Sequence, residues 1–88
     1  MSEAMTQQRQ KILIADDSEM NRDLLAAILE DEYEIIQAKD GVQAVDYLQK
    51  HAEEIVLVLL DLVMPQMDGY EVLVYMNKEH WIDYIPVV

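Results

Sequence analysis

The chain has 88 residues, with 18 acidic side chains, 6 lysines and arginines, and a formal net charge of −12 at pH 7. Hydrophobic residues make up 52% of it, which is too many for a disordered acidic tail, so we expect one folded domain. The acidity argues against direct binding to nucleic acid or to an anionic membrane, because both need a basic surface. Cysteine is absent, which excludes disulfides, thiolate zinc sites and cysteine catalysis.

The sequence also lacks signals for a membrane or for secretion. No stretch approaches the roughly 20 apolar residues that span a bilayer. Residues 1–10 are polar and lack the apolar segment of a secretory signal. We therefore expect a cytoplasmic protein with no membrane partner, in which residues 1–10 form a flexible leader and residues 11–88 form the domain.

Strands and helices are predicted to alternate from the start of this domain. Lys11–Ala15 is a short apolar run that suits a strand buried on both faces. Residues 18–30 carry apolar side chains at helical spacing, with acidic residues at the N-terminal end, where the helix dipole favours them. Residues 33–38 predict a second strand.

The same alternation continues in the second half. A helix is predicted to begin at Asp40, where Gln43 three residues later makes a variant of the capping box. Residues 55–60 are consecutive apolar residues and give the strongest signal for a central strand. A third helix is predicted over about residues 70–80, and a fourth strand from Ile85. This order predicts an α/β fold with a parallel sheet, right-handed crossovers and helices on both faces.

Three carboxylates come directly after predicted strands: Asp16 and Asp17 after the first, and Asp61 after the third. Ligand sites of open parallel sheets lie beyond the carboxyl ends of the strands, so these acids meet if the two strands are neighbours. Two unit charges about 4 Å apart repel by about 4 kcal/mol at an effective dielectric near 20, so a proton or a cation must relieve them. An all-oxygen site favours Mg²⁺ or Mn²⁺, and a carboxylate beside such an ion can act as a nucleophile. The alternative is that these acids only cap strands and helices on a solvated edge.

The segments that carry these acids resemble those of a known family. Residues 16–22, Asp-Asp-Ser-Glu-Met-Asn-Arg, are similar to the first strand–helix junction of receiver domains of two-component response regulators. Residues 61–69, Asp-Leu-Val-Met-Pro-Gln-Met-Asp-Gly, resemble the phosphoacceptor loop of that family, and residues 38–41 resemble its second junction. The resemblance covers residues 11–88. It implies a flavodoxin-like, doubly wound sheet of strand order 2-1-3-4-5, of which this chain would hold four of five strands and three of five helices.

The resemblance also implies a function for the acids. Asp61 would accept a phosphoryl group from a phosphohistidine of a sensor histidine kinase or phosphotransfer protein, in a Mg²⁺-dependent step. Asp17 would bind Mg²⁺ directly, Asp16 would help to position it, and Asp61 and the backbone carbonyl of Val63 would be further ligands. Asp68 would cap the third helix. The protein would catalyse at most its own phosphorylation and dephosphorylation, and the sequence does not identify its output domain.

The family pattern is incomplete in these 88 residues. Receivers also use a Thr or Ser at the end of the fourth strand and a Lys at the end of the fifth, and neither falls within the sequence. We therefore expect a truncated receiver, whose bare apolar surface and unpaired sheet edge leave it marginally stable or associated as a homodimer, by edge pairing or domain swapping.

Two other classes of function compete with this interpretation. A phosphorylation-independent interaction module, that is a degenerate or truncated receiver, fits the missing Thr/Ser and Lys but does not explain the intact acids. A Mg²⁺-dependent phosphatase with an aspartyl nucleophile usually has a second Asp two residues after the first, and Val63 occupies that position here.

Overall fold

The computed structural model of the chain describes residues 10–88, so the predicted leader lies outside the described residues apart from the exposed Gln10. The described part is a parallel sheet of order β2-β1-β3 with helices on both sides. Its elements in chain order are β1 (Lys11–Ala15), α2 (Glu19–Leu29), β2 (Glu34–Ala38), α3 (Gly41–His51), β3 (Ile55–Leu60), α4 (Gly69–Lys78) and the short 3-10 helix η1 (Trp81–Asp83).

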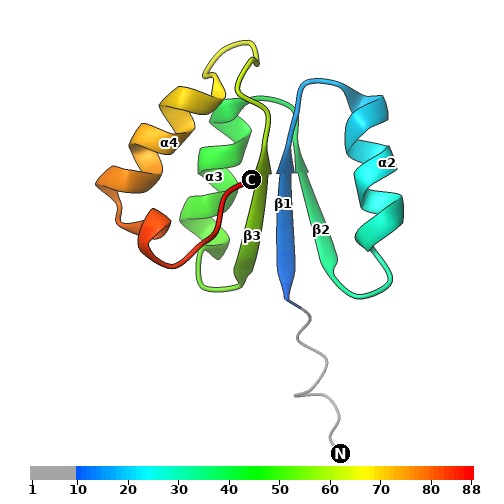
Figure 1. Cartoon of the computed structure of the whole chain (residues 1–88). Coiled ribbons are helices and arrows are strands. Elements are labelled where there is room, and N and C mark those ends of the chain that lie inside the picture. Colours follow the sequence, from blue (N-terminus) through cyan, green and yellow to red (C-terminus); the bar gives the residue numbers. More distant parts are fainter. Residues whose placement is uncertain (1–9) are drawn as a thin grey trace, which may run out of the picture.

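The arrangement of the helices confirms the doubly wound fold class. Helices α3 and α4 lie together on one side of the sheet, and α2 lies on the other (Figure 1). The chain steps from β1 to β2 in one direction and then crosses back over β1 to β3. Because right-handed crossovers in opposite directions place their helices on opposite faces, α2 and α3 lie on different sides of the sheet.

The fourth strand predicted from Ile85 is reduced to an isolated bridge, so the described sheet has three strands instead of four. Val87 pairs in parallel with Val58. The Val58 N–H donates to the Pro86 carbonyl at 3.0 Å, and the Val88 N–H donates to the Val58 carbonyl at 2.9 Å. The backbone of 86–88 thus begins a strand beside β3, but the pairing extends over too few residues to form a regular ladder.

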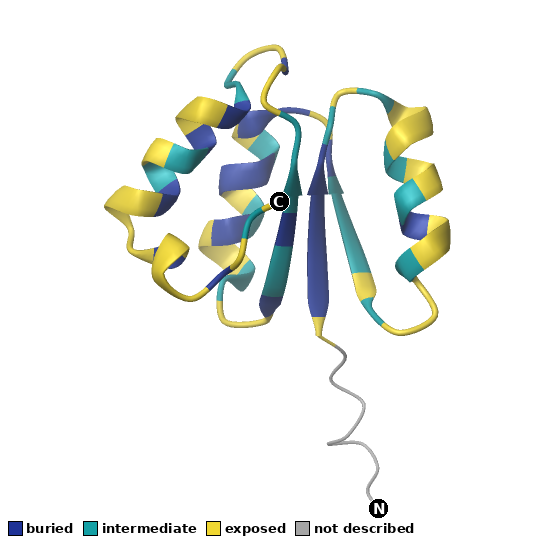
Figure 2. Ribbon diagram, viewed as in Figure 1, coloured by how far each residue is buried: buried dark blue, intermediate teal, exposed yellow. Residues whose placement is uncertain are grey.

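Strand β1 is the centre of the core. All five of its residues are buried, as expected for the middle strand of a sheet covered on both faces (Figure 2). Leu13 and Ala15 belong to the main hydrophobic cluster with residues of α3, α4 and β3, whereas the alternate residues Ile12 and Ile14 are buried outside that cluster. Helix α2 is much less buried, with Ala26 as its one buried residue.

Each helix begins at a polar N-cap. The side chains of Ser18 and Asp40 accept hydrogen bonds from the third residue of their helices, and Asp68 forms a full capping box with Glu71, as the resemblance implied. In the capping-box variant predicted at Asp40, the Gln43 side chain would accept a hydrogen bond from the Asp40 N–H. It accepts instead from the Lys39 N–H, one residue earlier, at 3.0 Å.

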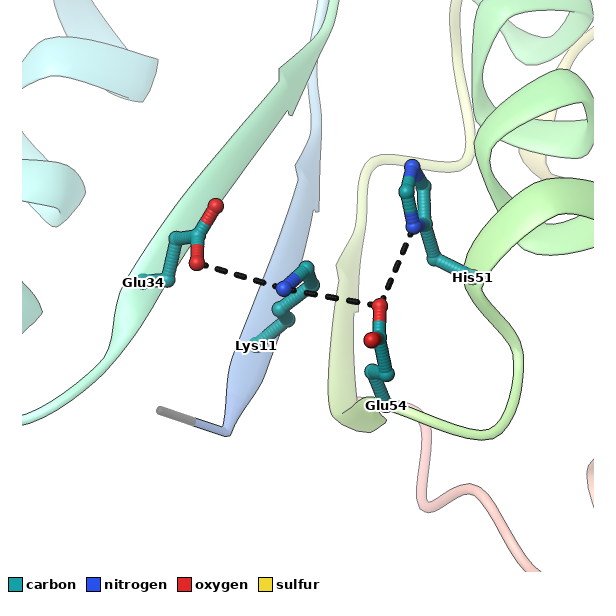
Figure 3. Close-up of polar contacts among 4 residues, drawn as sticks. All are labelled: Lys11, Glu34, His51 and Glu54. Carbon is teal, nitrogen blue, oxygen red and sulfur yellow. Dashed lines mark hydrogen bonds and ion pairs between the residues drawn. The ribbon is translucent and has the colours of Figure 1, made fainter. Parts of the chain in front are cut away.

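The amino end of β1 holds a cluster that the sequence did not predict, here called the Lys11 cluster and formed by Lys11, Glu34, His51 and Glu54 (Figure 3). Lys11 is only 8% exposed. Its Nζ lies 3.2 Å from Oε1 of Glu34 and 3.4 Å from Oε1 of Glu54, and Nδ1 of His51 lies 3.1 Å from the same Glu54 oxygen. One ammonium group therefore links β1 to β2 and to the residue just before β3.

These contacts shift the pKa values of two side chains, Lys11 and Glu54. The hydrogen bond with Glu34, supported by the nearby carboxylate charges and opposed by burial, raises the pKa of Lys11 above its ordinary value of 10.5. The hydrogen bond with His51 and the charge of Lys11 lower the pKa of Glu54 below its ordinary value of 4.5. Lys11 therefore stabilises the fold fully below pH 10.5 and less as the pH rises through its folded pKa. The contribution of Glu54 is full above pH 4.5 and is lost as the pH falls through its folded pKa.

This linkage predicts the alkaline stability of the Lys11→Met variant. We expect the melting temperature of the unmodified protein to fall as the pH rises above about 10, and the variant to show a shallower fall because it has no ammonium group to lose. Circular dichroism melts between about pH 8 and about pH 11.5 measure this slope. Lys78→Met, at an exposed position of α4, is the control and should keep the original slope. Equal slopes for Lys11→Met and the unmodified protein would contradict the prediction.

Candidate metal centre

The three predicted acids meet at the carboxyl end of the sheet. Ala15 of β1 pairs with Leu60 of β3, and the Asp61 N–H continues this ladder by donating to the Ala15 carbonyl at 2.9 Å. On the other side of β1, the Asp16 N–H donates to the Ala38 carbonyl of β2 at 3.0 Å. The strand order therefore places the two segments that carry acids side by side.

One carboxylate oxygen from each of Asp16, Asp17 and Asp61 lies within 4.8 Å of the others. Asp16 and Asp61 are half-buried, and Asp17 is exposed. These three residues are here called the acidic cluster. The expectation that the acids converge is confirmed as geometry, and their roles as ligands stay a prediction.

Two of the carboxylates are oriented by the backbone. Oδ1 of Asp16 accepts a hydrogen bond from the Ser18 N–H at 2.9 Å, and Oδ1 of Asp61 accepts one from the Val63 N–H at 3.1 Å. Each bond uses an N–H group two residues further along the chain, which is the local turn geometry that aspartate favours. Each of these carboxylates thus has one oxygen oriented by its own loop, while the second makes no hydrogen bond within residues 10–88.

The donor set of the acidic cluster fits a small divalent cation. All three groups offer carboxylate oxygens, and within the described chain none of them forms an ion pair with a lysine, arginine or histidine. Three carboxylates at this separation repel one another. A cation such as Mg²⁺, which binds through a few carboxylates and keeps several water molecules, relieves this repulsion.

A pocket of about 350 Å³ adjoins the cluster on the side of α2. Asp16, Asn21 and Asp61 provide its polar wall, and its remaining lining is largely apolar, with Leu25 and Leu59 among the contributors. A small group can therefore reach the carboxylates over an apolar floor.

Two glycines allow the backbone of the loop between β3 and α4 to pack closely against the starts of α3 and α4. The Gly69 N–H donates to the Leu62 carbonyl at 3.1 Å, and the Gly41 N–H of α3 donates to the Met67 carbonyl at 2.9 Å. A Cβ atom on Gly69 would collide with the backbone carbonyl of Asp61, and one on Gly41 would collide with that of Met67. Neither glycine has a positive φ, so close approach of the backbone, and not backbone freedom, requires glycine here.

Other predicted site features have mixed outcomes. Val63 is 78% exposed and donates its N–H to Asp61, and its carbonyl as a metal ligand stays a prediction. The third helix ends at Lys78, earlier than the predicted residue 80, because His80 adopts a left-handed backbone with φ of 65°.

The contact of Arg22 with the backbone of Asp16 was not predicted from the sequence. A basic residue in the first turns of a helix opposes the helix dipole, and this unfavourable placement was a visible signal of a partner elsewhere in the fold.

Comparisons with known proteins identify the family to which this fold belongs. The family model of the response regulator receiver domain matches residues 12–88. The response regulator RR06 of Streptococcus pneumoniae is 45% identical over 75 residues, which are 84% of this chain and 34% of that protein. The structure of the chemotaxis response regulator CheY4 of Vibrio cholerae superposes with a TM-score of 0.81 at 29% identity, over 90% of this chain and 65% of that one. A CheX–CheY–BeF3–Mg²⁺ complex from Borrelia burgdorferi matches with a TM-score of 0.69 at 34% identity, over 81% of this chain and 55% of that chain.

The chain belongs to the response regulator receiver domain family. It has the CheY-like flavodoxin fold and is a receiver domain of two-component signalling, a class of modules that signal and are in general not enzymes. Receiver domains of this class typically bind Mg²⁺ and interact with kinases or phosphotransfer proteins. The chain spans about a third of the length of the Streptococcus relative. Within the described residues, no helix is long and apolar enough to cross a membrane.

The close packing of Gly69 predicts the effect of Gly69→Ala. The added methyl group has to displace the Asp61 backbone, so we expect the free energy of unfolding to fall by about 1–3 kcal/mol, as for other overpacked sites. Urea unfolding followed by circular dichroism measures this loss. Asn77→Ala, at an exposed position of the same helix, should leave the stability nearly unchanged. An equally stable Gly69→Ala protein would contradict the close approach of the backbone.

Proposed function

We propose that this chain is a phosphoryl-accepting receiver, in which Asp61 takes a phosphoryl group from the phosphohistidine of a sensor histidine kinase or phosphotransfer protein. The observation that carries the proposal is the convergence of Asp16, Asp17 and Asp61 at the carboxyl end of neighbouring strands. We assign the receiver segment to residues 11–88 and place the protein in the cytoplasm. The output function of the protein is assigned to a domain outside these residues.

The proposed step is an in-line displacement at phosphorus. A carboxylate oxygen of Asp61 attacks the phosphorus, the new P–O bond forms as the P–N bond to the imidazole breaks, and the leaving imidazole takes up a proton. Phosphoryl transfer depends mainly on alignment and on neutralising charge on oxygen. The hydrogen bond from the Val63 N–H supports the alignment, because it holds one Asp61 oxygen, while the other makes no hydrogen bond within residues 10–88 and can attack.

Asp16, Asp17, Asp61 and the carbonyl of Val63 are the proposed protein ligands of Mg²⁺. When bound, the ion would neutralise charge on the phosphoryl oxygens and on the carboxylates. The half-buried Asp16 and Asp61 would hold it against the sheet edge, and the exposed Asp17 would reach it from the solvent side.

Replacement of the nucleophile tests the proposed function. We expect the unmodified protein to gain the mass of one phosphoryl group when incubated with acetyl phosphate and Mg²⁺, and Asp61→Asn to gain none, because the amide lacks a nucleophilic oxygen anion. Intact-protein mass spectrometry measures the adduct, and EDTA should abolish it in the unmodified protein.

Asp68→Asn is the matched control, because it removes an acid from the same loop while asparagine still caps a helix. This variant should be phosphorylated like the unmodified protein. No adduct on the unmodified protein would contradict the proposal and would favour the phosphorylation-independent interaction module.

We further propose that this 88-residue chain associates with a second copy through the outer edge beside β3. An apolar groove of about 430 Å³ lies there between β3, α4 and η1. Leu62, Ile82 and Val88 are exposed in this region, and the outer edge of residues 86–88 has no backbone partner within the described chain. Unpaired edges and bare apolar grooves both promote association.

A charge at this edge should reduce the association. We expect the unmodified chain to increase in apparent mass with concentration in light scattering after gel filtration, and Val88→Lys to shift toward the monomer because a charged edge strand resists pairing. Val74→Lys is the control, since both valines are exposed, at 77% for Val88 and 69% for Val74, but Val74 lies on α4 outside the groove lining. A monodisperse monomer at every concentration would contradict this proposal.

A further inference from the structure

Arg22 connects three elements around the acidic cluster. Its Nη1 donates to the backbone carbonyl of Asp16 at 2.8 Å, and its Nε donates to Oε1 of Gln37 on β2 at 3.0 Å. The Gln37 amide in turn donates to Oδ1 of Asp23 on α2 at 3.3 Å, which orients the amide. A single guanidinium therefore joins α2, the loop after β1 and strand β2.

The position of Arg22 is unfavourable for the helix itself. It is the fourth residue of α2, near the end where the helix dipole is positive and disfavours a cation. The side chain is half-buried in spite of this, and its two acceptors lie on different elements. The planar guanidinium suits this task because it presents its donors in a fixed fork, which a lysine lacks.

With Arg22 in place, Asp16 is held at three points. Its N–H donates to the Ala38 carbonyl at 3.0 Å, its carbonyl accepts from Arg22, and its Oδ1 accepts from the Ser18 N–H. Two of these bonds come from the backbone of adjoining segments, and the third depends on the Arg22 side chain. Asp17 follows Asp16 directly, so restraint of the Asp16 carbonyl also restrains the peptide from which Asp17 projects.

We propose that Arg22 is a positioning residue for the acidic cluster: by bridging the Asp16 carbonyl and Gln37, it fixes the backbone of Asp16 and Asp17 and so strengthens binding of a divalent cation. This inference rests on the proposed function in one respect, that the cluster binds Mg²⁺. Arg22 does not touch the ion or the phosphoryl group and acts only through Asp16.

The sign of the effect separates positioning from charge. Arg22 is a cation close to a cation site, so its charge alone opposes Mg²⁺ and its removal would tighten binding. Loss of a residue that orients a ligand weakens binding, typically by about tenfold or more. The two explanations therefore predict opposite changes for the neutral variant Arg22→Gln.

Titration calorimetry with MgCl2 tests the inference on the 88-residue chain, at a temperature where circular dichroism shows each variant folded. We expect Arg22→Gln to bind Mg²⁺ about tenfold more weakly than the unmodified protein. Gln37→Ala removes the second acceptor without changing the charge and should weaken binding in the same direction, to a smaller extent. Lys78→Gln matches the charge change of Arg22→Gln at a distant exposed site and should bind as the unmodified protein does.

Melting temperatures in EDTA supply the second readout. A merely structural role would lower the melting temperature of the metal-free Arg22→Gln protein and leave its affinity for Mg²⁺ unchanged, and that result would overturn the inference. Equal or tighter binding by Arg22→Gln would overturn it too. Should Arg22→Gln fail to fold, Gln37→Ala decides the matter: weaker binding supports the inference, and unchanged binding overturns it. If the unmodified protein binds no Mg²⁺, both the inference and the proposed metal site are wrong. If the variants bind Mg²⁺ as tightly as the unmodified protein does, only the inference is wrong.

Discussion

The hydrogen-bonded register between β1 and β3 is the constraint on which the rest of the structure depends. Ala15 lies opposite Leu60, so the residues that follow, Asp16 and Asp61, leave the sheet at the same level. A shift of one residue would turn every side chain of a strand to the other face. The acidic cluster is a consequence of the observed register.

The two ends of β1 differ in their electrostatics. At its amino end, Lys11 pairs with two glutamates from neighbouring segments, so each of these carboxylates has a cationic partner. At its carboxyl end, three carboxylates converge with no ion-pair partner in the described part of the chain. The first arrangement ties the strands together. At the second, a cation or a proton would offset the repulsion, and the proposed metal site is based on this.

The cluster is held from several directions at once. The Asp61 backbone is packed against Gly69, and Met67 in the same loop is bonded to Gly41 of α3. The Asp16 backbone is restrained by β2 and by Arg22. In the proposed function this support matters, because phosphoryl transfer gains its rate from alignment, and small displacements of the carboxylates would reduce that rate.

The alternation of strands and helices, the N-cap at Asp40 and the placement of three acids after strands were predictable from the residues, because they depend on periodicity and on residues a few positions apart. The cap at Asp68 was predicted only from the resemblance to the receiver family. The residue pattern left the meeting of the acids conditional on strands one and three being neighbours. The family resemblance implied that order, and the structure shows it. The bridge of Arg22 to Asp16 and the burial of Lys11 between two glutamates were visible only in the structure. The structure also reduced the predicted fourth strand to one bridge. The physical reason is that these features join residues far apart in the chain, and such contacts exist only once the strand order and register have brought their elements together.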